Sequence, residues 1–264
     1  MSLDRQFAGS IPALYEECLV PVLFTPYAQD LVRRAAALQP GTVLELAAGT
    51  GAVSWMLAQA LPEARIVATD LNPAMIEVAA ARGWADNLSF EVADAQALAF
   101  PTGAFDLVIA QFGAMFFPDK VDAYRQVRRV LAAGGTFLFN VWAELEANNG
   151  SEAIHYAVRA ALPEPRPDFI ARTPFAYHDA LRIEWELRQA GFAGVSIERI
   201  ELASPPGSAR ALARGMCLGS PLANELAAHS PELRDAAFAA AVEAAERVEA
   251  GGALRMAALV VTAT

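Results

Sequence analysis

Cysteine is scarce in this chain of 264 residues, which contains only two. Cys18 and Cys217 each stand in an apolar stretch and form neither a CxxC pair nor a Cys/His cluster. A structural zinc site requires such a cluster, so the sequence predicts no zinc site and offers no other metal site. We expect both thiols to be buried as small apolar side chains.

Long apolar runs are also missing. Hydrophobic residues make up 55% of the chain, but no run reaches the ~18 residues that a membrane-spanning helix needs. Residues 1–12 include Asp4 and Arg5 and lack the apolar centre of a signal peptide. These absences predict a cytoplasmic protein that does not work at a membrane.

Positive charge is in short supply as well. The chain has 20 Lys and Arg residues against 30 Asp and Glu residues, for a formal net charge of −10. Proteins that bind nucleic acids usually present a basic face, whereas the basic residues here are scattered, with short pairs at Arg33-Arg34 and Arg128-Arg129. We therefore expect no nucleic-acid partner, and the composition leaves the oligomeric state open.

Residues 42–142 alternate between two kinds of pattern. Short apolar runs predict strands, and amphipathic stretches between them, such as 120–131, predict helices. Strands that alternate with helices of about 10 to 15 residues are typical of a parallel sheet with helices on both faces. The sequence thus predicts an α/β fold with a doubly wound, Rossmann-like sheet, whose first strands lie at 42–46, 64–69, 88–92, 105–110 and 136–142.

Regularity weakens after Trp142. A Pro-rich connector at 163–167 interrupts a mostly helical region, and strand patterns return at 195–202 and 254–261. Because strands resume after the connector, we expect one domain over 1–264 rather than two. Its expected parts are an N-terminal helical cover (1–39), a ligand-binding core (40–143), helical cap insertions (144–178 and 205–250) and the rest of the core (179–204 and 251–264).

A glycine-rich turn follows the first of these strands. Gly49 and Gly51 leave the backbone free to bend close to a ligand, and a helix begins behind them. Asp70 ends the next strand, where a carboxylate can accept both hydrogen bonds of a ribose diol. NAD-binding proteins have a third glycine where this chain has Ser54, and Glu45 suits a cationic ligand better than a pyrophosphate. The pattern predicts a nucleotide site of another kind.

Several motifs in register resemble the class I S-adenosylmethionine-dependent methyltransferases. They are Glu-Leu-Ala-Ala-Gly-Thr-Gly (45–51), Thr-Asp-Leu-Asn-Pro-Ala-Met (69–75), Ala-Asp-Ala (93–95) and Phe-Asp-Leu-Val-Ile-Ala-Gln-Phe (105–112). The resemblance covers residues 40–142, and the most similar subgroup is the ubiquinone/menaquinone type of small-molecule methyltransferase. It implies S-adenosylmethionine as the cofactor, methyl transfer to a small molecule, and a seven-stranded sheet with an antiparallel last strand.

The resemblance also implies roles for individual residues. The backbone of Ala47, Gly49 and Gly51 would hold the methionine part of the cofactor, with Glu45 orienting the loop and the ammonium group. Asp70 would bind the ribose hydroxyls. The remaining cofactor contacts would come from Leu71 and Met75 beside the adenine, Asp94 and Ala95 at its edge, and the Gln111 carbonyl at the ammonium group. Ala47 departs from the family, since many relatives have glycine there.

The methyl acceptor is harder to predict. Methyl transfer is an in-line displacement at a sulfonium, for which the cofactor supplies the electrophile, so a dedicated base is not required. Tyr15, His155 and His178 are candidates for catalysis. The segment after the fourth strand lacks the Asn/Asp-Pro-Pro-aromatic signature of nucleobase-amine methyltransferases, and its Phe112, Phe116 and Phe117 suggest a small, partly apolar acceptor beneath the cap insertions. Two alternatives are an NAD(P)-dependent oxidoreductase on a similar sheet and a module that binds S-adenosylmethionine without transferring its methyl group.

Overall fold

The computed structural model describes Asp4, Phe7 and residues 9–264, and the chain forms two compact units. The helical unit comprises Met1–Pro26, Trp142–Ala176 and Glu201–Ala257, within which residues 1–3, 5–6 and 8 lie outside the described residues. The sheet unit comprises Tyr27–Val141, Tyr177–Ile200 and Ala258–Thr264. Each unit is therefore built from separate stretches of sequence, and the assignment of 1–264 to one domain with cap insertions stays a prediction.

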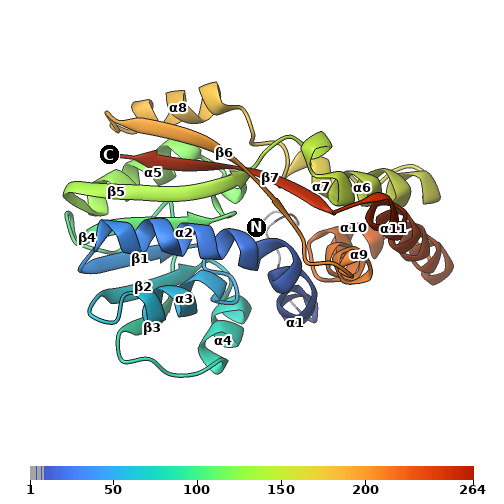
Figure 1. Cartoon of the computed structure of the whole chain (residues 1–264), viewed down its shortest axis with the longest axis horizontal. Coiled ribbons are helices and arrows are strands. Elements are labelled where there is room, and N and C mark those ends of the chain that lie inside the picture. Colours follow the sequence, from blue (N-terminus) through green and yellow to red (C-terminus); the bar gives the residue numbers. More distant parts are fainter. Residues whose placement is uncertain (1–3, 5–6, 8) are drawn as a thin grey trace. The chain divides into compact units, whose positions relative to one another are not determined.

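Seven strands form a single sheet in the order β3-β2-β1-β4-β5-β7-β6 (Figure 1). The neighbours among β1 to β5 are parallel. At the other edge, Gly194 and Thr264 exchange backbone hydrogen bonds of 3.0 and 2.9 Å, as antiparallel partners do. The predicted seven-stranded sheet with an antiparallel last strand is confirmed. Its strands are β1 Thr42–Leu46, β2 Arg65–Asp70, β3 Leu88–Val92, β4 Phe105–Gln111, β5 Leu131–Trp142, β6 Val195–Ala203 and β7 Arg255–Ala263.

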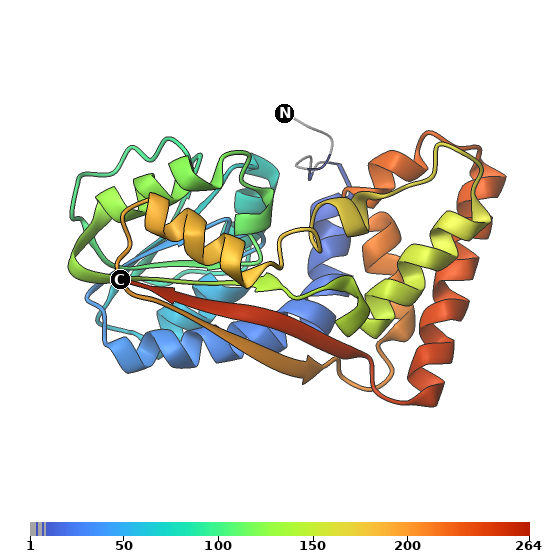
Figure 2. The same ribbon diagram turned by 90° about the horizontal axis from the view of Figure 1, so that it is seen from above.

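Successive side chains of a strand point to opposite faces of the sheet, so each face presents its own set of side chains. Helices cover both faces. On one face, Leu138 of β5 belongs to a buried core with apolar residues of α2 (Thr25–Leu38) and α3 (Ala52–Ala60). On the other face, Phe137 and Phe139 stack at 4.5 Å and both contact Tyr124 of α5 (Lys120–Val130). Figure 2 shows α2 on one side of the sheet, with α5 and α8 (Ala180–Gln189) on the other.

Strand β5 begins five residues before the predicted start at residue 136. Its pairing with β4 shifts register, since Phe105 is opposite Leu131 while Leu107 is opposite Thr136. Gly134 lies in this bulge with φ of 78°, and a Cβ on Gly135 would lie 3.0 Å from the carbonyl oxygen of Asp106. The two glycines therefore permit an irregular pairing between β4 and β5, and strand β5 continues through them.

The helical unit contains the segments predicted as helical on either side of the Pro-rich connector. Its helix α9 approaches the π-helical segment η2 closely, because a Cβ on Gly215 would lie 2.5 Å from Leu19 Cδ2. Cys18 and Cys217 are buried here and unbridged, as expected, and burial raises the pKa of Cys217 to about 12. The elements are α1 Ile11–Leu14, η2 Tyr15–Phe24, η4 Leu145–Ala147, α6 Asn149–Ala161, α7 Phe169–Arg172, α9 Ala209–Leu218, α10 Leu222–Leu226 and α11 Pro231–Gly251.

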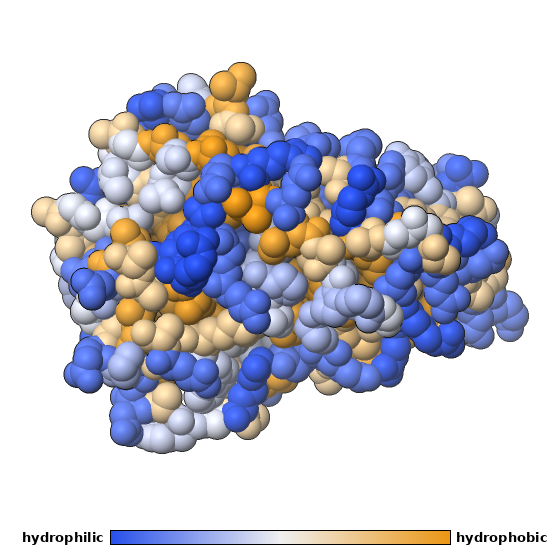
Figure 3. Space-filling model, viewed as in Figure 1, coloured by the Kyte–Doolittle hydropathy of each residue, from blue (hydrophilic) through white to orange (hydrophobic). Residues whose placement is uncertain are grey.

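The N-terminal region, predicted as a helical cover over 1–39, is helical from Ile11 to Leu38, but the helix is not uniform. Residues Tyr15–Phe24 form a wider, π-helical stretch that contains Pro21. Proline lacks an N–H and its ring clashes with the carbonyl of the preceding turn, so a regular α-helix is disfavoured there. No helix in the described part of the chain is long and apolar enough to span a membrane. Hydrophilic and hydrophobic residues are interspersed over the face drawn in Figure 3.

Candidate cofactor site

The loops that follow β1, β2 and β3 meet at one edge of the sheet unit, because the strands are parallel. The Ala48 N–H donates to the Thr69 carbonyl at 2.9 Å, and the Ala93 N–H donates to the Asp70 carbonyl at 3.0 Å. The Thr69 hydroxyl donates to the Glu45 carbonyl at 2.8 Å. These bonds tie together three segments, 45–51, 69–72 and 93–95, on which most of the sequence-predicted cofactor residues lie.

The backbone of the loop after β1 is unusual. Ala47, Gly49 and Gly51 all have positive φ values, of 52°, 56° and 82°. Glycine adopts this conformation freely, whereas an alanine is strained there by about 1 kcal/mol or more. The Ala47 side chain is accommodated because a glycine faces it: a Cβ on Gly113 would lie only 2.4 Å from the Ala47 Cβ. The departure of Ala47 from the family's glycine is thus matched by Gly113.

Gly51 is a point of close packing as well as a turn. It precedes α3 in a left-handed conformation, and a Cβ at this position would lie 3.1 Å from the Ala79 Cβ and 3.2 Å from the Trp55 Cδ1. Ala79 belongs to α4 (Pro73–Ala81). Gly51 therefore lets α3 and α4 approach each other, a structural role that the motif alone did not predict.

Asp70 joins two of the loops through its carboxylate. One oxygen accepts the Gly49 N–H at 2.9 Å, and the other accepts the Asn72 N–H at 2.8 Å. Burial raises the pKa of Asp70, while these backbone hydrogen bonds act in the opposite direction. A carboxylate offers about four lone-pair sites, so capacity remains for ribose hydroxyls. Asp70 builds the loop in addition to its predicted role with the cofactor.

Glu45 is buried in the middle of the sheet, with 1% of its surface exposed. The Ser54 hydroxyl on α3 donates to its Oε2 at 2.5 Å. Burial raises the pKa of Glu45 to about 8, the Asp70 charge raises it further, and the Ser54 hydrogen bond opposes both. Sequence reasoning missed the role of Ser54. The available signal was a polar residue in the first turn of a mostly apolar helix, where NAD-binding proteins have glycine.

Two buried polar groups beside these loops lack partners. Among the described residues, neither the Thr50 Oγ1 nor the Asn140 Nδ2 has a hydrogen-bond partner. Asn140 is opposite Gln111 in the β4–β5 pairing, and its Oδ1 accepts the Phe112 N–H at 2.9 Å. An unpaired buried polar group costs about 1–3 kcal/mol. Thr50 lies within the left-handed loop itself, so a polar ligand held there can relieve that cost.

The other predicted cofactor residues differ in exposure. Leu71 and Ala95 are half-buried, and Met75 is buried in α4. Asp94 is exposed after β3, and its Oδ1 accepts the Gln96 N–H at 2.9 Å. The structure places all of these residues in the sheet unit, while their individual contacts with a cofactor stay predictions.

The three candidates for catalysis are divided between the two units, with Tyr15 and His155 in the helical unit. Tyr15 belongs to the helical unit, where it stacks on Phe24 at 5.0 Å. His178 is exposed and belongs to the sheet unit. His155 is buried in α6, where burial and the nearby Arg159 lower its pKa. Their catalytic roles stay predictions.

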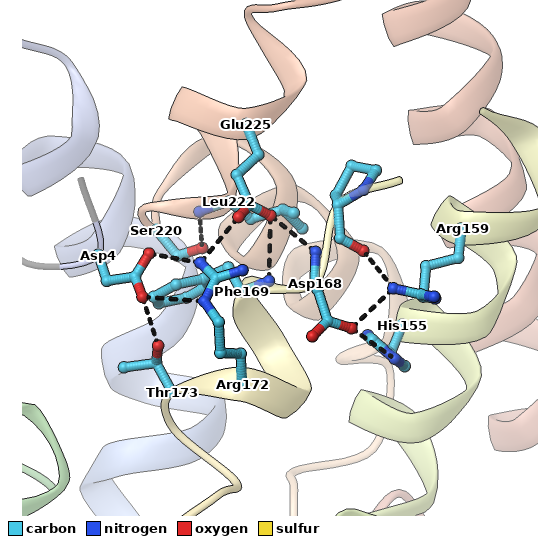
Figure 4. Close-up of polar contacts among 11 residues, drawn as sticks. Asp4, His155, Arg159, Asp168, Phe169, Arg172, Thr173, Ser220, Leu222 and Glu225 are labelled. Atoms are coloured by element: carbon cyan, nitrogen blue, oxygen red, sulfur yellow. Dashed lines mark hydrogen bonds and ion pairs between the residues drawn. The ribbon is translucent and has the colours of Figure 1, made fainter. Parts of the chain in front are cut away.

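His155 lies at one end of a network of charged groups in the helical unit (Figure 4). Its Nε2 is 4.0 Å from the Asp168 Oδ1, which also accepts from Arg159 at 2.7 Å. Glu225 accepts the backbone N–H groups of Asp168 and Phe169 at 2.8 and 3.0 Å, so it caps the start of α7. Its second oxygen pairs with an arginine of α7, which also binds Asp4. His155 therefore lies beside a network of contacts that holds the start of α7 in place.

Replacing Glu225 by alanine should lower the free energy of unfolding by about 1–3 kcal/mol, because two backbone donors of α7 lose their acceptor. Urea denaturation would measure the change. Glu246→Ala is the matched control, since this exposed carboxylate is 3.9 Å from Arg210 and such surface pairs contribute at most about 1 kcal/mol. Equal effects of the two substitutions would show that the network does not stabilise the unit.

Known proteins resemble this chain in sequence and in fold. Residues 43–135 match the model of the methyltransferase domain family. Over these residues the chain is similar to methyltransferases. It is 43% identical to a demethylmenaquinone methyltransferase of Thermus thermophilus over 98 residues. This match covers 36% of this chain and 44% of that protein. It is 36% identical over 102 residues to a ubiquinone/menaquinone biosynthesis C-methyltransferase of Hahella chejuensis, covering 37% and 41% respectively.

The matched stretch of this chain therefore spans less than half of the length of each of these two relatives. A solved structure supports the fold over a longer stretch. The phosphoethanolamine N-methyltransferase 2 of Haemonchus contortus, in complex with S-adenosyl-L-methionine, has a TM-score of 0.65 and 15% identity, covering 100% of this chain and 60% of that one. At this identity the likeness concerns the fold alone.

S-adenosylmethionine is the cofactor that the likeness to methyltransferases implies, and the residues present fit it. When bound, it supplies an electrophilic methyl group. The loop 45–51 has three left-handed residues and the unpaired Thr50 hydroxyl. Two buried carboxyl groups, those of Glu45 and Asp70, adjoin the loop and match a ligand with positive charge. The residues that would hold it are Glu45, Ala47, Gly49, Gly51, Asp70, Leu71, Met75, Asp94, Ala95 and Gln111.

Proposed function

We propose that this protein is a cytoplasmic enzyme that binds S-adenosylmethionine at the 45–51 loop and transfers its methyl group to a small, partly apolar acceptor. The observation that carries the proposal is the pair of buried carboxyl groups beside a left-handed, glycine-containing loop. This arrangement suits a compact cationic nucleoside better than a dinucleotide, because two acidic side chains offer a pyrophosphate no positive partner.

The segment after β4 supports an apolar acceptor. Residues 112–117 read Phe-Gly-Ala-Met-Phe-Phe and contain no titratable side chain. The Lys120 ammonium donates to the carbonyls of Met115 and Phe117 at 3.3 and 3.0 Å, which fixes the end of this segment. We infer that the segment positions the acceptor and excludes water, while transfer proceeds without a dedicated base.

The names of the relatives indicate which acceptor to test first. The matched protein of Thermus thermophilus is named a demethylmenaquinone methyltransferase, and that of Hahella chejuensis a ubiquinone/menaquinone biosynthesis C-methyltransferase. A ring that carries an electron-rich carbon or oxygen, such as a demethylated quinol, combines a reactive atom with the apolar character that the 112–117 segment favours. We propose this class of small molecule as the acceptor, with no nucleic acid or membrane as a partner.

Two experiments test the proposal in sequence. In titration calorimetry, S-adenosylmethionine and S-adenosylhomocysteine should bind, while NADH should give no heat of binding. With methyl-labelled S-adenosylmethionine, the label should then appear in a demethylated naphthoquinol but not in a nucleic acid. Binding of NADH alone would assign the protein to the oxidoreductases. Cofactor binding without transfer to a panel of quinols, phenols and amines would identify a binding module.

A further inference from the structure

The two buried carboxyl groups of the site share an unusual electrostatic setting. Glu45 on β1 and Asp70 on β2 are 1% and 7% exposed. In the part of the chain that the structure describes, neither carboxyl forms an ion pair with a lysine or an arginine. Burying a carboxylate without a cation is costly and favours the protonated form. Two backbone N–H groups oppose this at Asp70, whereas Glu45 accepts from the Ser54 hydroxyl.

The groups around Glu45 are neutral or negative on every side. From α3, the Ser54 hydroxyl donates to the carboxyl at 2.5 Å. From β2, the contribution is the negative charge of Asp70, and the residue paired with Glu45 on that strand is Ala68. From β4, the paired residue is Ile109. Since the pKa of Glu45 is about 8 in this setting, its carboxyl carries a proton at pH 7.

We propose that binding of S-adenosylmethionine in the 45–51 loop is coupled to release of the proton of the buried Glu45 carboxyl. This inference rests on the proposed function, because it requires a cationic ligand at this loop. The O–H bond of the carboxyl breaks, the proton passes to a base in the solvent, and the carboxylate stays beside the newly bound positive charge. No group is oxidised or reduced. Glu45 thus acts as the counter-charge that appears only when the cofactor is present.

Coupling of this kind fixes the direction of the pH dependence. Below pH 8 the empty site holds the proton and must lose it on binding, so the association constant rises with pH by up to about tenfold per unit. Above pH 8 the carboxyl is already ionised, and this rise stops. The amino group of the ligand itself titrates near pH 8, but binding of its ammonium form takes up a proton. The two effects therefore have opposite signs.

Titration calorimetry of the intact protein with S-adenosylmethionine, without an acceptor, measures the protons exchanged. The binding enthalpy at pH 7 is compared in phosphate, HEPES and Tris, whose ionisation enthalpies differ. We expect the wild type to release roughly one proton more than Glu45→Gln. Ser54→Ala is the matched variant, because it keeps the carboxyl but removes a hydrogen bond that favours its ionised form. Its affinity should stop rising at a higher pH than that of the wild type.

The outcomes separate this inference from the proposed function. If wild type and Glu45→Gln exchange the same number of protons, the inference is wrong although the cofactor binds. If the wild type does not bind S-adenosylmethionine at any pH, the proposed function itself fails. Should Glu45→Gln not fold, ¹³C NMR of glutamate carboxyl carbons in the wild type at pH 7 gives the answer. A buried carboxyl resonance that shifts to the carboxylate position on binding supports release, and an unchanged one overturns it.

Discussion

Valine in place of Gly51 should abolish cofactor binding and lower the free energy of unfolding by about 2–4 kcal/mol. The backbone at this position has φ of 82°, which a β-branched residue adopts only under strain. The added Cβ would also lie 3.1 Å from the Ala79 Cβ, tighter than ordinary contact. The loop motif alone does not reveal this effect on stability, because the contact with Ala79 of α4 arises only in the fold.

Gly134→Val separates strain from packing in this test. Gly134 has a similar φ of 78° in the same unit, but a Cβ there would meet nothing within 4 Å. We expect this control to cost about 1–2 kcal/mol and to bind cofactor normally. Denaturation in urea and calorimetry with S-adenosylhomocysteine provide the two measurements. Normal binding by a folded Gly51→Val protein would show that this loop does not hold the cofactor.

Alanine in place of Asp70 should weaken the binding of S-adenosylhomocysteine at least tenfold. Two hydrogen bonds from ribose hydroxyls to a carboxylate contribute at most about 1.5–3 kcal/mol each, so the loss of both is readily measured by calorimetry. The structure adds a second effect. The N–H groups of Gly49 and Asn72 lose their acceptor, and we expect the free energy of unfolding to fall by about 1–3 kcal/mol.

Because Asp70→Ala is also expected to lose stability, a second variant is needed to isolate the effect on binding. Asp70→Asn keeps a side-chain oxygen for one of the two backbone donors while removing the charge, so it should be more stable than Asp70→Ala yet still bind weakly. Asp86→Ala, which removes the acceptor of the exposed Trp84 indole N–H, controls for loss of a surface carboxylate. Unchanged affinity in a folded Asp70→Asn protein would contradict the ribose assignment.

Local sequence determined the elements of the sheet unit closely. The strands at 42–46 and 88–92 were predicted with the bounds that they have in the structure. These signals are local, because apolar runs, prolines and glycines act on their own backbone. The motif order also led to the resemblance to methyltransferases, which implied the seven-stranded sheet with an antiparallel last strand. The start of β5 was misjudged, because a bulge depends on the partner strand.

Tertiary structure alone decided what surrounds each motif residue. Nothing in the local sequence places the Ser54 hydroxyl on Glu45, the Ala79 side chain against Gly51, or Gly113 against Ala47, since each pair joins elements that are separate in the chain. Likewise, the grouping of Met1–Pro26, Trp142–Ala176 and Glu201–Ala257 into a helical unit depends on contacts between distant segments. The sequence determined which residues carry the chemistry, because their types and spacing reflect the ligand. Only the fold determined their burial and charge, because these arise from neighbours that the chain brings together when it folds.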